Sequence, residues 1–303
     1  MHVFISYSHQ QSDWVCQRLA PCLEAGGADV LIDKDRFQIG KAVVGQMDAL
    51  QDSAERHLLV LSPEYLSSDY CLHEMQRAIK LDPKFDKGLV LPVRRVDCAL
   101  PKAFTGWNPP LYAKLIDDRQ PEPWNALLRE CGANGLGTDA PAWLEARDEI
   151  VELIGRGQSV NLVTQGEPNW RGLLTHLRRG QFPEMGLVNL EDPDTTSRRG
   201  LLAAMAKALG GRAPLPIAPD DLAGFKSLLE NLAPSKLILT HFDLASHRAY
   251  YDVDLFSTLR YLIMEMRKLT LLIQSRTPFG ALLPRDHPLS DMDIKTVELR
   301  GLK

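Results

Sequence analysis

The chain has 303 residues, 45% hydrophobic and 24% charged, with a formal net charge of −4. This length favours two domains, and the composition is that of an ordinary globular protein. No basic stripe supplies phosphate contacts, and no apolar run approaches the roughly twenty residues that span a bilayer, so neither nucleic acid nor a membrane is an expected partner.

The cysteines are scattered and none has C-x-x-C spacing: Cys16, Cys22, Cys71, Cys98 and Cys131. This argues against a zinc site and a disulfide framework, so we expect no bound metal and reduced thiols in a cytoplasm. The first strand pattern begins almost at Met1, which predicts that no signal peptide is present.

Strand and helix patterns alternate along the first half of the chain. The strand patterns are His2–Ser6, Val30–Ile32, His57–Leu61 and Leu89–Val93. The helix patterns are Ser12–Ala25, a stripe of Val43, Met47 and Leu50, the segment that contains Glu74, and Glu122–Cys131. This alternation predicts an α/β fold with a doubly wound parallel sheet of flavodoxin type.

Residues 132–140 have the composition of a linker. We therefore predict domains at 1–133 and 141–303, joined by a linker at 134–140. The second half again alternates, which predicts another α/β domain. Its expected strands are Val160–Thr164, Gly186–Leu190, Lys236–Thr240, Thr270–Gln274 and Lys295–Leu299, and its expected helices are Ala142–Gly155, Trp170–Arg179, Arg199–Leu209, Leu222–Leu232 and Leu255–Lys268.

Three loops of the first domain are expected to meet at one crevice. In an open α/β sheet, ligands bind outside the carboxyl ends of the strands, where strand order reverses. The contributing loops follow strands one, two and three. They carry Ser6, Tyr7 and Ser8, then Asp33, Arg36 and Phe37, and finally Tyr70 and Glu74.

Several motifs of residues 1–133 occur in an order that resembles the Toll/interleukin-1 receptor (TIR) domain. They are Val3-Phe4-Ile5-Ser6-Tyr7-Ser8, Asp33-x-Asp35-Arg36-x-x-x-Gly40, Leu59-Val60-Leu61-Ser62-Pro63-x-Tyr65, Ser68-x-Tyr70-Cys71-x-x-Glu74 and Leu91-Pro92-Val93. Two features depart from the family pattern: Tyr70 stands where tryptophan is common, and Phe37-Gln38-Ile39 precedes Gly40 where a proline often stands.

The resemblance implies cleavage of NAD+ as substrate, by hydrolysis or cyclisation, with no bound cofactor. It makes Glu74 the catalytic residue, and it implies self-association in which the loop after strand two helps form a neighbour's site. It also implies a setting in prokaryotic defence against phage.

The chemistry suits these residues. Breaking the nicotinamide–ribose bond develops positive charge on the ribose. One carboxylate that accepts hydrogen bonds from the ribose hydroxyls can stabilise that charge. Tyr7 or Tyr70 would stack on a ring of the substrate, and Arg36 would contact its diphosphate.

Several of these residues also have a purely structural interpretation. Glu74 could interact favourably with the helix dipole, Tyr7 could pack in the core, and Asp33 and Arg36 could form an ion pair with each other. The alternative functions are a non-enzymatic TIR scaffold or adaptor for signalling, and a nucleoside-processing transferase.

The second half resembles a P-loop ATPase core of the AAA or STAND kind, without its chemistry. A phosphate loop needs glycines, a lysine and a hydroxyl in G-x-x-x-x-G-K-[ST], but residues 165–172 include Glu167 and Pro168 and no such Lys-Ser/Thr pair. Thr240-His241 replaces the usual acidic pair, with Asp243 two residues further on. We therefore expect a degenerate ATPase-like domain that senses an activating protein or ligand, or drives self-association.

Overall fold

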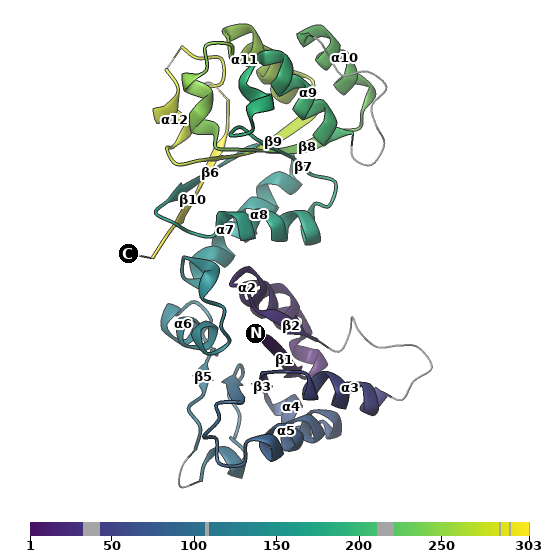
Figure 1. Ribbon diagram of the computed structural model, residues 1–303, viewed down its shortest axis with the longest axis vertical. Coiled ribbons are helices and arrows are strands. Elements are labelled where there is room, and N and C mark those ends of the chain that lie inside the picture. The colour runs from purple at the N-terminus through teal and green to yellow at the C-terminus, as the bar shows by residue number, and fades with distance from the viewer. Residues whose placement is uncertain (33–42, 107–108, 211–220, 285, 291, 303) are drawn as a thin grey trace. The chain divides into compact units, whose positions relative to one another are not determined.

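A computed structural model describes residues 1–32, 43–106, 109–210, 221–284, 286–290 and 292–302. The chain divides into two compact units, Met1–Leu144 and Glu145–Lys303, and each contains one five-stranded parallel sheet (Figure 1). The predicted fold class of two α/β domains is confirmed. The predicted linker contains a short 3-10 turn at Asn134–Leu136, and the exact domain bounds stay a prediction.

The sheet of the first unit has the strand order β2-β1-β3-β4-β5, which is the flavodoxin-like order. Its strands are β1 (His2–Tyr7), β2 (Asp29–Leu31), β3 (Arg56–Leu61), β4 (Val90–Arg94) and β5 (Ala113–Lys114). The sequence patterns indicated the first four. They missed β5, since two residues are too short for a periodic pattern and this strand exists through its pairing with β4.

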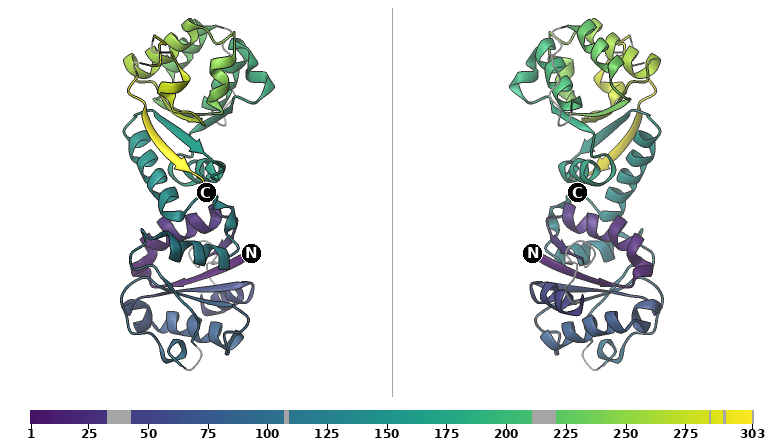
Figure 2. Two further views of the ribbon diagram at one scale, coloured as in Figure 1. Left: turned by 90° about the vertical axis from the view of Figure 1, so that its left-hand side faces the viewer. Right: turned by 90° about the vertical axis from the view of Figure 1, so that its right-hand side faces the viewer.

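Helices cover both faces of this sheet (Figure 2). They are α1 (Ser12–Trp14), α2 (Ala20–Ala25), α3 (Val43–Asp52), α4 (Pro63–Ser67), α5 (Asp69–Leu81) and α6 (Pro121–Glu130). The central strands β1 and β3 are buried along almost their whole length, β3 from His57 to Leu61. A strand covered on both faces is expected to be a continuous apolar run, as this one nearly is.

The first predicted helix is interrupted. A π-helical turn at Val15–Leu19 separates α1 from α2, and the Ala20 N–H bonds to the Val15 carbonyl, five residues back. Pro21 follows directly and has no N–H to donate into an α-helical ladder, which explains the local widening. Gly26 and Gly27 then end α2, with Gly27 at a φ of 102°.

The sheet of the second unit has the order β10-β6-β9-β8-β7. Its strands are β6 (Val160–Gln165), β7 (Gly186–Asn189), β8 (Ser235–Thr240), β9 (Leu269–Ser275) and β10 (Lys295–Arg300), so all five expected strands form. The helices are α7 (Ala140–Gly155), which crosses the division between the units, α8 (Trp170–His176), α9 (Arg198–Leu209), α10 (Leu222–Asn231), α11 (Val253–Arg260) and α12 (Phe279–Leu282).

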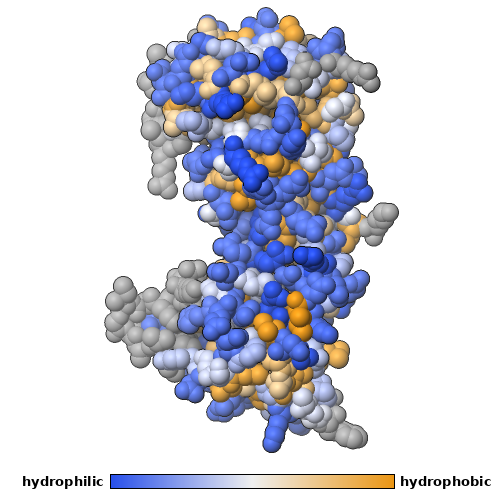
Figure 3. All heavy atoms as spheres, turned by 180° about the vertical axis from the view of Figure 1, so that it is seen from behind, coloured by the Kyte–Doolittle hydropathy of each residue, from blue (hydrophilic) through white to orange (hydrophobic). Residues whose placement is uncertain are grey.

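One large core cluster of the second unit joins β8 and β9 to α9, α10 and α11, with Phe225, Leu237 and Leu271 almost completely buried. Viewed from behind, the molecular surface mixes hydrophilic residues with small hydrophobic groups (Figure 3). No described helix combines the length and apolar character required to cross a bilayer.

Candidate functional site

Glu74 lies on the buried stripe of α5. The helix begins after Ser68, whose hydroxyl accepts the Cys71 N–H, and Asp69 in the first turn favours the positive end of the helix dipole. The buried residues Cys71, Glu74, Met75 and Ala78 recur at helical spacing, so a carboxylate stands where an apolar residue would be expected. Only 6% of Glu74 is exposed. A buried carboxylate needs polar partners to offset its desolvation.

The contacts of Glu74 bring together elements from distant parts of the sequence. The Ser6 hydroxyl, at the carboxyl end of β1, makes a short hydrogen bond to Glu74 Oε2. The same Ser6 Oγ lies 2.7 Å from the hydroxyl oxygen of Tyr65, on α4. The buried Gln51 side chain, on α3, donates to the Glu74 backbone carbonyl at 2.8 Å. These bonds fix both the backbone and the carboxylate of Glu74.

A cavity of about 450 Å³ opens beside this carboxylate. Its volume falls in the range of small-molecule sites. The lining mixes aromatic, hydroxyl and carboxylate groups: Ile5, Tyr7, Ser8, His9, Gln10, Glu64, Ser67, Ser68, Tyr70, Cys71 and Glu74. Since β1 and β3 are neighbours in the sheet, the cavity lies where the strand order reverses.

Five of the predicted site residues are therefore brought together. Tyr7, Ser8, Tyr70 and Glu74 line the cavity. Ser6 is not part of the lining, and its hydroxyl bonds to the Glu74 carboxylate. Tyr7 is buried and Tyr70 is 59% exposed, so the two aromatic rings differ in their access to solvent.

The other three predicted residues, Asp33, Arg36 and Phe37, lie outside the described residues. Sequence reasoning did not assign Tyr65 or Gln51 to the site. Tyr65 does stand in the motif Ser62-Pro63-x-Tyr65, and that was the one available signal for it.

Ion pairs join α5 to α3 on the solvent side of the site. Arg77 contacts Asp52 at 2.7 Å and Asp48 at 3.3 Å, and His73 contacts Asp48 at 3.1 Å. His73 therefore belongs to this helix-to-helix contact. Among the described residues, no group of three or more His, Cys, Asp or Glu side chains is arranged to hold a metal ion.

A layer of polar side chains crosses the carboxyl edge of the second sheet. The Gln274 amide bridges β8 and β6, because its oxygen accepts the His241 N–H at 2.8 Å and its nitrogen donates to Thr164 at 2.9 Å. Asp243 accepts the backbone N–H groups of Arg276 and Thr277, at 2.8 and 3.1 Å. The Asp243 carboxylate thus supports the loop that follows β9.

His241 sits in a left-handed backbone conformation at the end of β8, with φ of 56°. Its ring bonds to Asn189 at 2.7 Å and packs edge-on against Trp170, at the start of α8. Burial lowers the pKa of the His241 imidazole. The described side chains at this edge thus form hydrogen bonds with one another.

Residues 3–128 match the family model described as TIR domain. A 74-residue stretch is 34% identical to human Toll-like receptor 1 and 32% identical to human Toll-like receptor 6. This stretch is 24% of the chain and 9% of each receptor, so most of the length of these relatives has no counterpart in the match.

Among solved structures, the chain is similar to the TIR domain of the Toll-related receptor TRR-2 from Hydra magnipapillata, with 19% identity and a TM-score of 0.37 over 43% of this chain and 96% of that one. It is also similar to a Walker-type ATPase of Pyrococcus abyssi, with 10% identity and a TM-score of 0.39 over 52% of this chain and 53% of that one. With the family match, the strand order and the motifs in sequence order, the chain carries a TIR domain at its N-terminus.

Proposed function

We propose that the protein is an NAD+ nucleosidase, with Glu74 as its catalytic residue, and that self-association of its TIR domains activates it. One observation carries the proposal: a buried carboxylate, held by hydroxyl groups, borders a 450 Å³ cavity at the switch point of the sheet. Buried ionisable groups in such clefts are concentrated at functional sites.

The proposed reaction needs little from the protein beyond this carboxylate. The C–N bond between nicotinamide and ribose breaks, and its electron pair goes to the pyridinium nitrogen, so nicotinamide leaves as a neutral molecule. The ribose carbon becomes cationic, and Glu74 stabilises it electrostatically while accepting hydrogen bonds from the ribose hydroxyls. Water then adds and loses a proton, which gives ADP-ribose, or an internal nucleophile of the substrate closes a cyclic product.

The other candidate residues have supporting roles in this proposal. Tyr7 and Tyr70 offer rings that stack on nicotinamide or adenine, while Ser8 offers a hydroxyl at the cavity wall. Arg36 is proposed to bind the diphosphate, and Asp33 and Phe37 are proposed to take part in substrate binding and, by resemblance to TIR domains, in the contact with a neighbouring copy.

The second unit is proposed to regulate the first. Two features support a role in sensing an activating protein or ligand, without turnover of ATP. The segment at the place of a phosphate loop lacks the required residues, and the polar side chains at the carboxyl edge of the sheet bond to neighbouring protein groups. Defence against phage is the proposed setting, and infection of cells that express wild type or Glu74→Gln tests it through survival of the culture.

The direct test is nicotinamide release from NAD+ by concentrated protein, with assembly followed by light scattering. We expect Glu74→Gln, which keeps an oxygen for the Ser6 hydrogen bond, to lower the rate at least about 100-fold. Asp69→Asn is the control, because it removes one negative charge from the first turn of the same helix and leaves Glu74 in place.

Each alternative gives its own result. Equal turnover in wild type and Glu74→Gln would exclude Glu74 as the catalytic group. An assembled wild type without turnover would favour the scaffold, and cleavage of nucleosides without cleavage of NAD+ would favour the transferase.

A further inference from the structure

We propose that Tyr65 is a positioning residue for Glu74: its hydroxyl donates to Ser6 and thereby directs the single Ser6 proton onto the Glu74 carboxylate. This inference rests on the proposed function, and it adds a residue that touches neither the substrate nor the reacting bond. It starts from the buried contact between the three side chains.

The direction of the two hydrogen bonds follows from the number of protons. Glu74 as a carboxylate can only accept, so Ser6 must use its one hydroxyl proton in the bond to Glu74 Oε2. Ser6 then has only lone pairs to offer at its 2.7 Å contact with Tyr65, so the Tyr65 hydroxyl is the donor. The chain of donation therefore runs from Tyr65 to Ser6 to Glu74.

Burial gives this chain its strength. Tyr65 is 0% exposed, Ser6 1% and Glu74 6%, so the bond between Tyr65 and Ser6 is shielded from solvent, while Glu74 also borders the cavity. A hydrogen bond to a charged acceptor is stronger than a neutral one, and donors in series polarise one another. This series of hydrogen bonds favours the charged form of the Glu74 carboxylate, which is the form that the reaction needs.

Tyr65 keeps its proton under all practical assay conditions. Burial, as the largest cause, raises the pKa of the Tyr65 phenol well above its usual range, while the Ser6 hydrogen bond opposes this and the nearby Glu74 charge adds to it. The phenol therefore remains a donor wherever the protein is folded and Glu74 is ionised.

The fold holds Tyr65 in place independently of its hydroxyl. Its backbone N–H donates to the Ser62 hydroxyl at 3.2 Å, in the cap of α4. Its ring belongs to a core cluster with Leu59, Leu61 and Cys71. Tyr65→Phe keeps this packing and removes only the hydroxyl, which makes it a clean test of donation.

The first measurement does not depend on turnover. The side-chain carboxyl carbon of Glu74 is followed by 13C NMR in the full-length protein with labelled glutamate, and its signal is assigned by its absence from Glu74→Gln. We expect this signal to move in Tyr65→Phe. It should stay in place in Tyr251→Phe, which removes a different buried tyrosine hydroxyl, in the second unit.

The second measurement uses the rate of nicotinamide release. In Tyr65→Phe we expect kcat to fall about fivefold with KM unchanged, since the loss of one net hydrogen bond is worth a factor of that order. The acid limb of the pH–rate profile should move to higher pH. In the Glu74→Gln background, Tyr65→Phe should cause no further loss.

These outcomes separate the two proposals. A Glu74 signal that does not move in Tyr65→Phe would overturn the positioning role, whatever the turnover. A fivefold loss that persists in the Glu74→Gln background would overturn it as well, because Tyr65 would then act by another route. A signal that moves in Tyr65→Phe, together with an assembled wild type that shows no turnover, would support the positioning role and refute the nucleosidase.

Discussion

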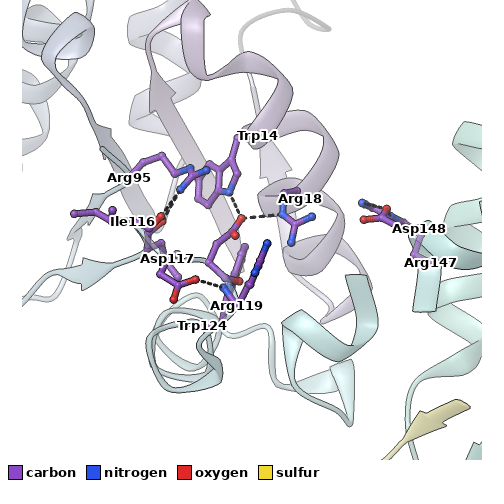
Figure 4. A network of polar contacts seen from close by, with 11 residues as sticks. Trp14, Arg18, Arg95, Ile116, Asp117, Arg119, Trp124, Arg147 and Asp148 are labelled. Atoms are coloured by element: carbon purple, nitrogen blue, oxygen red, sulfur yellow. Dashed lines mark hydrogen bonds and ion pairs between the residues drawn. The ribbon is translucent and has the colours of Figure 1, made fainter. Parts of the chain in front are cut away.

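Asp118 ties the first helix of the TIR domain to the segment that follows β5. Its carboxylate accepts the indole N–H of Trp14 and the guanidinium Nε–H of Arg18, both at 2.8 Å (Figure 4). Its backbone carbonyl accepts the indole N–H of Trp124 at 2.9 Å. Asp118→Ala should therefore leave a buried indole N–H without this acceptor and remove one charge partner of the half-buried Arg18.

The magnitude follows from these two bonds. A lost hydrogen bond to a charged group costs about 1.5–3 kcal/mol, and part of the arginine's share is recovered by water because its side chain is 28% exposed. We expect Asp118→Ala to lower the free energy of unfolding by roughly 3 kcal/mol, which corresponds to about 6–12 °C in the melting temperature of a unit of this size. Asp118→Asn keeps an acceptor for Trp14 and should cost about 1 kcal/mol.

Thermal melts with hydrogen exchange resolved by segment test this, because a two-unit chain need not melt in one step. The exposed neighbour Asp117 is the control, since among the described residues its carboxylate accepts the Arg119 backbone N–H and the Gln120 side-chain amide, both close in sequence. Faster exchange should appear in α1, α2 and α6 for Asp118→Ala. Equal melting temperatures for Asp118→Ala and Asp117→Ala would show that the Asp118 hydrogen bonds do not stabilise the first unit.

Three further predictions concern groups elsewhere in the chain. Burial lowers the pKa of His57 to about 4, so the folded state excludes a proton that the unfolded state binds below about pH 6.5. The stability from this group should be complete above pH 6.5 and lost as the pH falls toward 4. His57→Leu should flatten the pH dependence of the melting temperature, and an unchanged dependence would contradict this. Burial raises the pKa of the Cys131 thiol to about 12, so iodoacetamide at pH 8 should label exposed Cys16 in the native protein and spare Cys131. Peptide mass spectrometry that finds Cys131 labelled first would show the opposite. Asp243→Ala should lower the stability of the second unit by about 1–2 kcal/mol through its two lost backbone caps. The wild type should not hydrolyse ATP, and Asp243-dependent hydrolysis would reverse this view of the domain.

The sequence predicted those elements whose pattern is long and regular. β3 is a buried apolar run and α5 has an amphipathic stripe with a capping serine, so both could be read from residue spacing alone. Strand β5 could not, because two residues carry no period and their pairing with β4 depends on tertiary structure. The π turn at Val15–Leu19 was not predicted, because the apolar spacing over Ser12–Ala25 indicates one continuous helix.

The sequence predicted several of the residues that meet at the candidate site, but not the residue that is proposed to position Glu74. Glu74 and Ser6 could be placed at one sheet edge, because the carboxyl ends of parallel strands meet there. The contact between Ser6 and Tyr65 depends on the orientation of a short helix, which residue spacing does not determine. Tyr65 was visible as part of a motif and its donor role was not, since that role follows from a proton count across three buried groups.

One comparison of three proteins shows whether Glu74 is the residue responsible for NAD+ cleavage. Nicotinamide release is measured for wild type, Asp69→Asn and Glu74→Gln at one concentration at which all three are shown to be assembled. We predict similar rates for the first two proteins and a rate at least about 100-fold lower for Glu74→Gln. Equal rates in all three assembled proteins would contradict it.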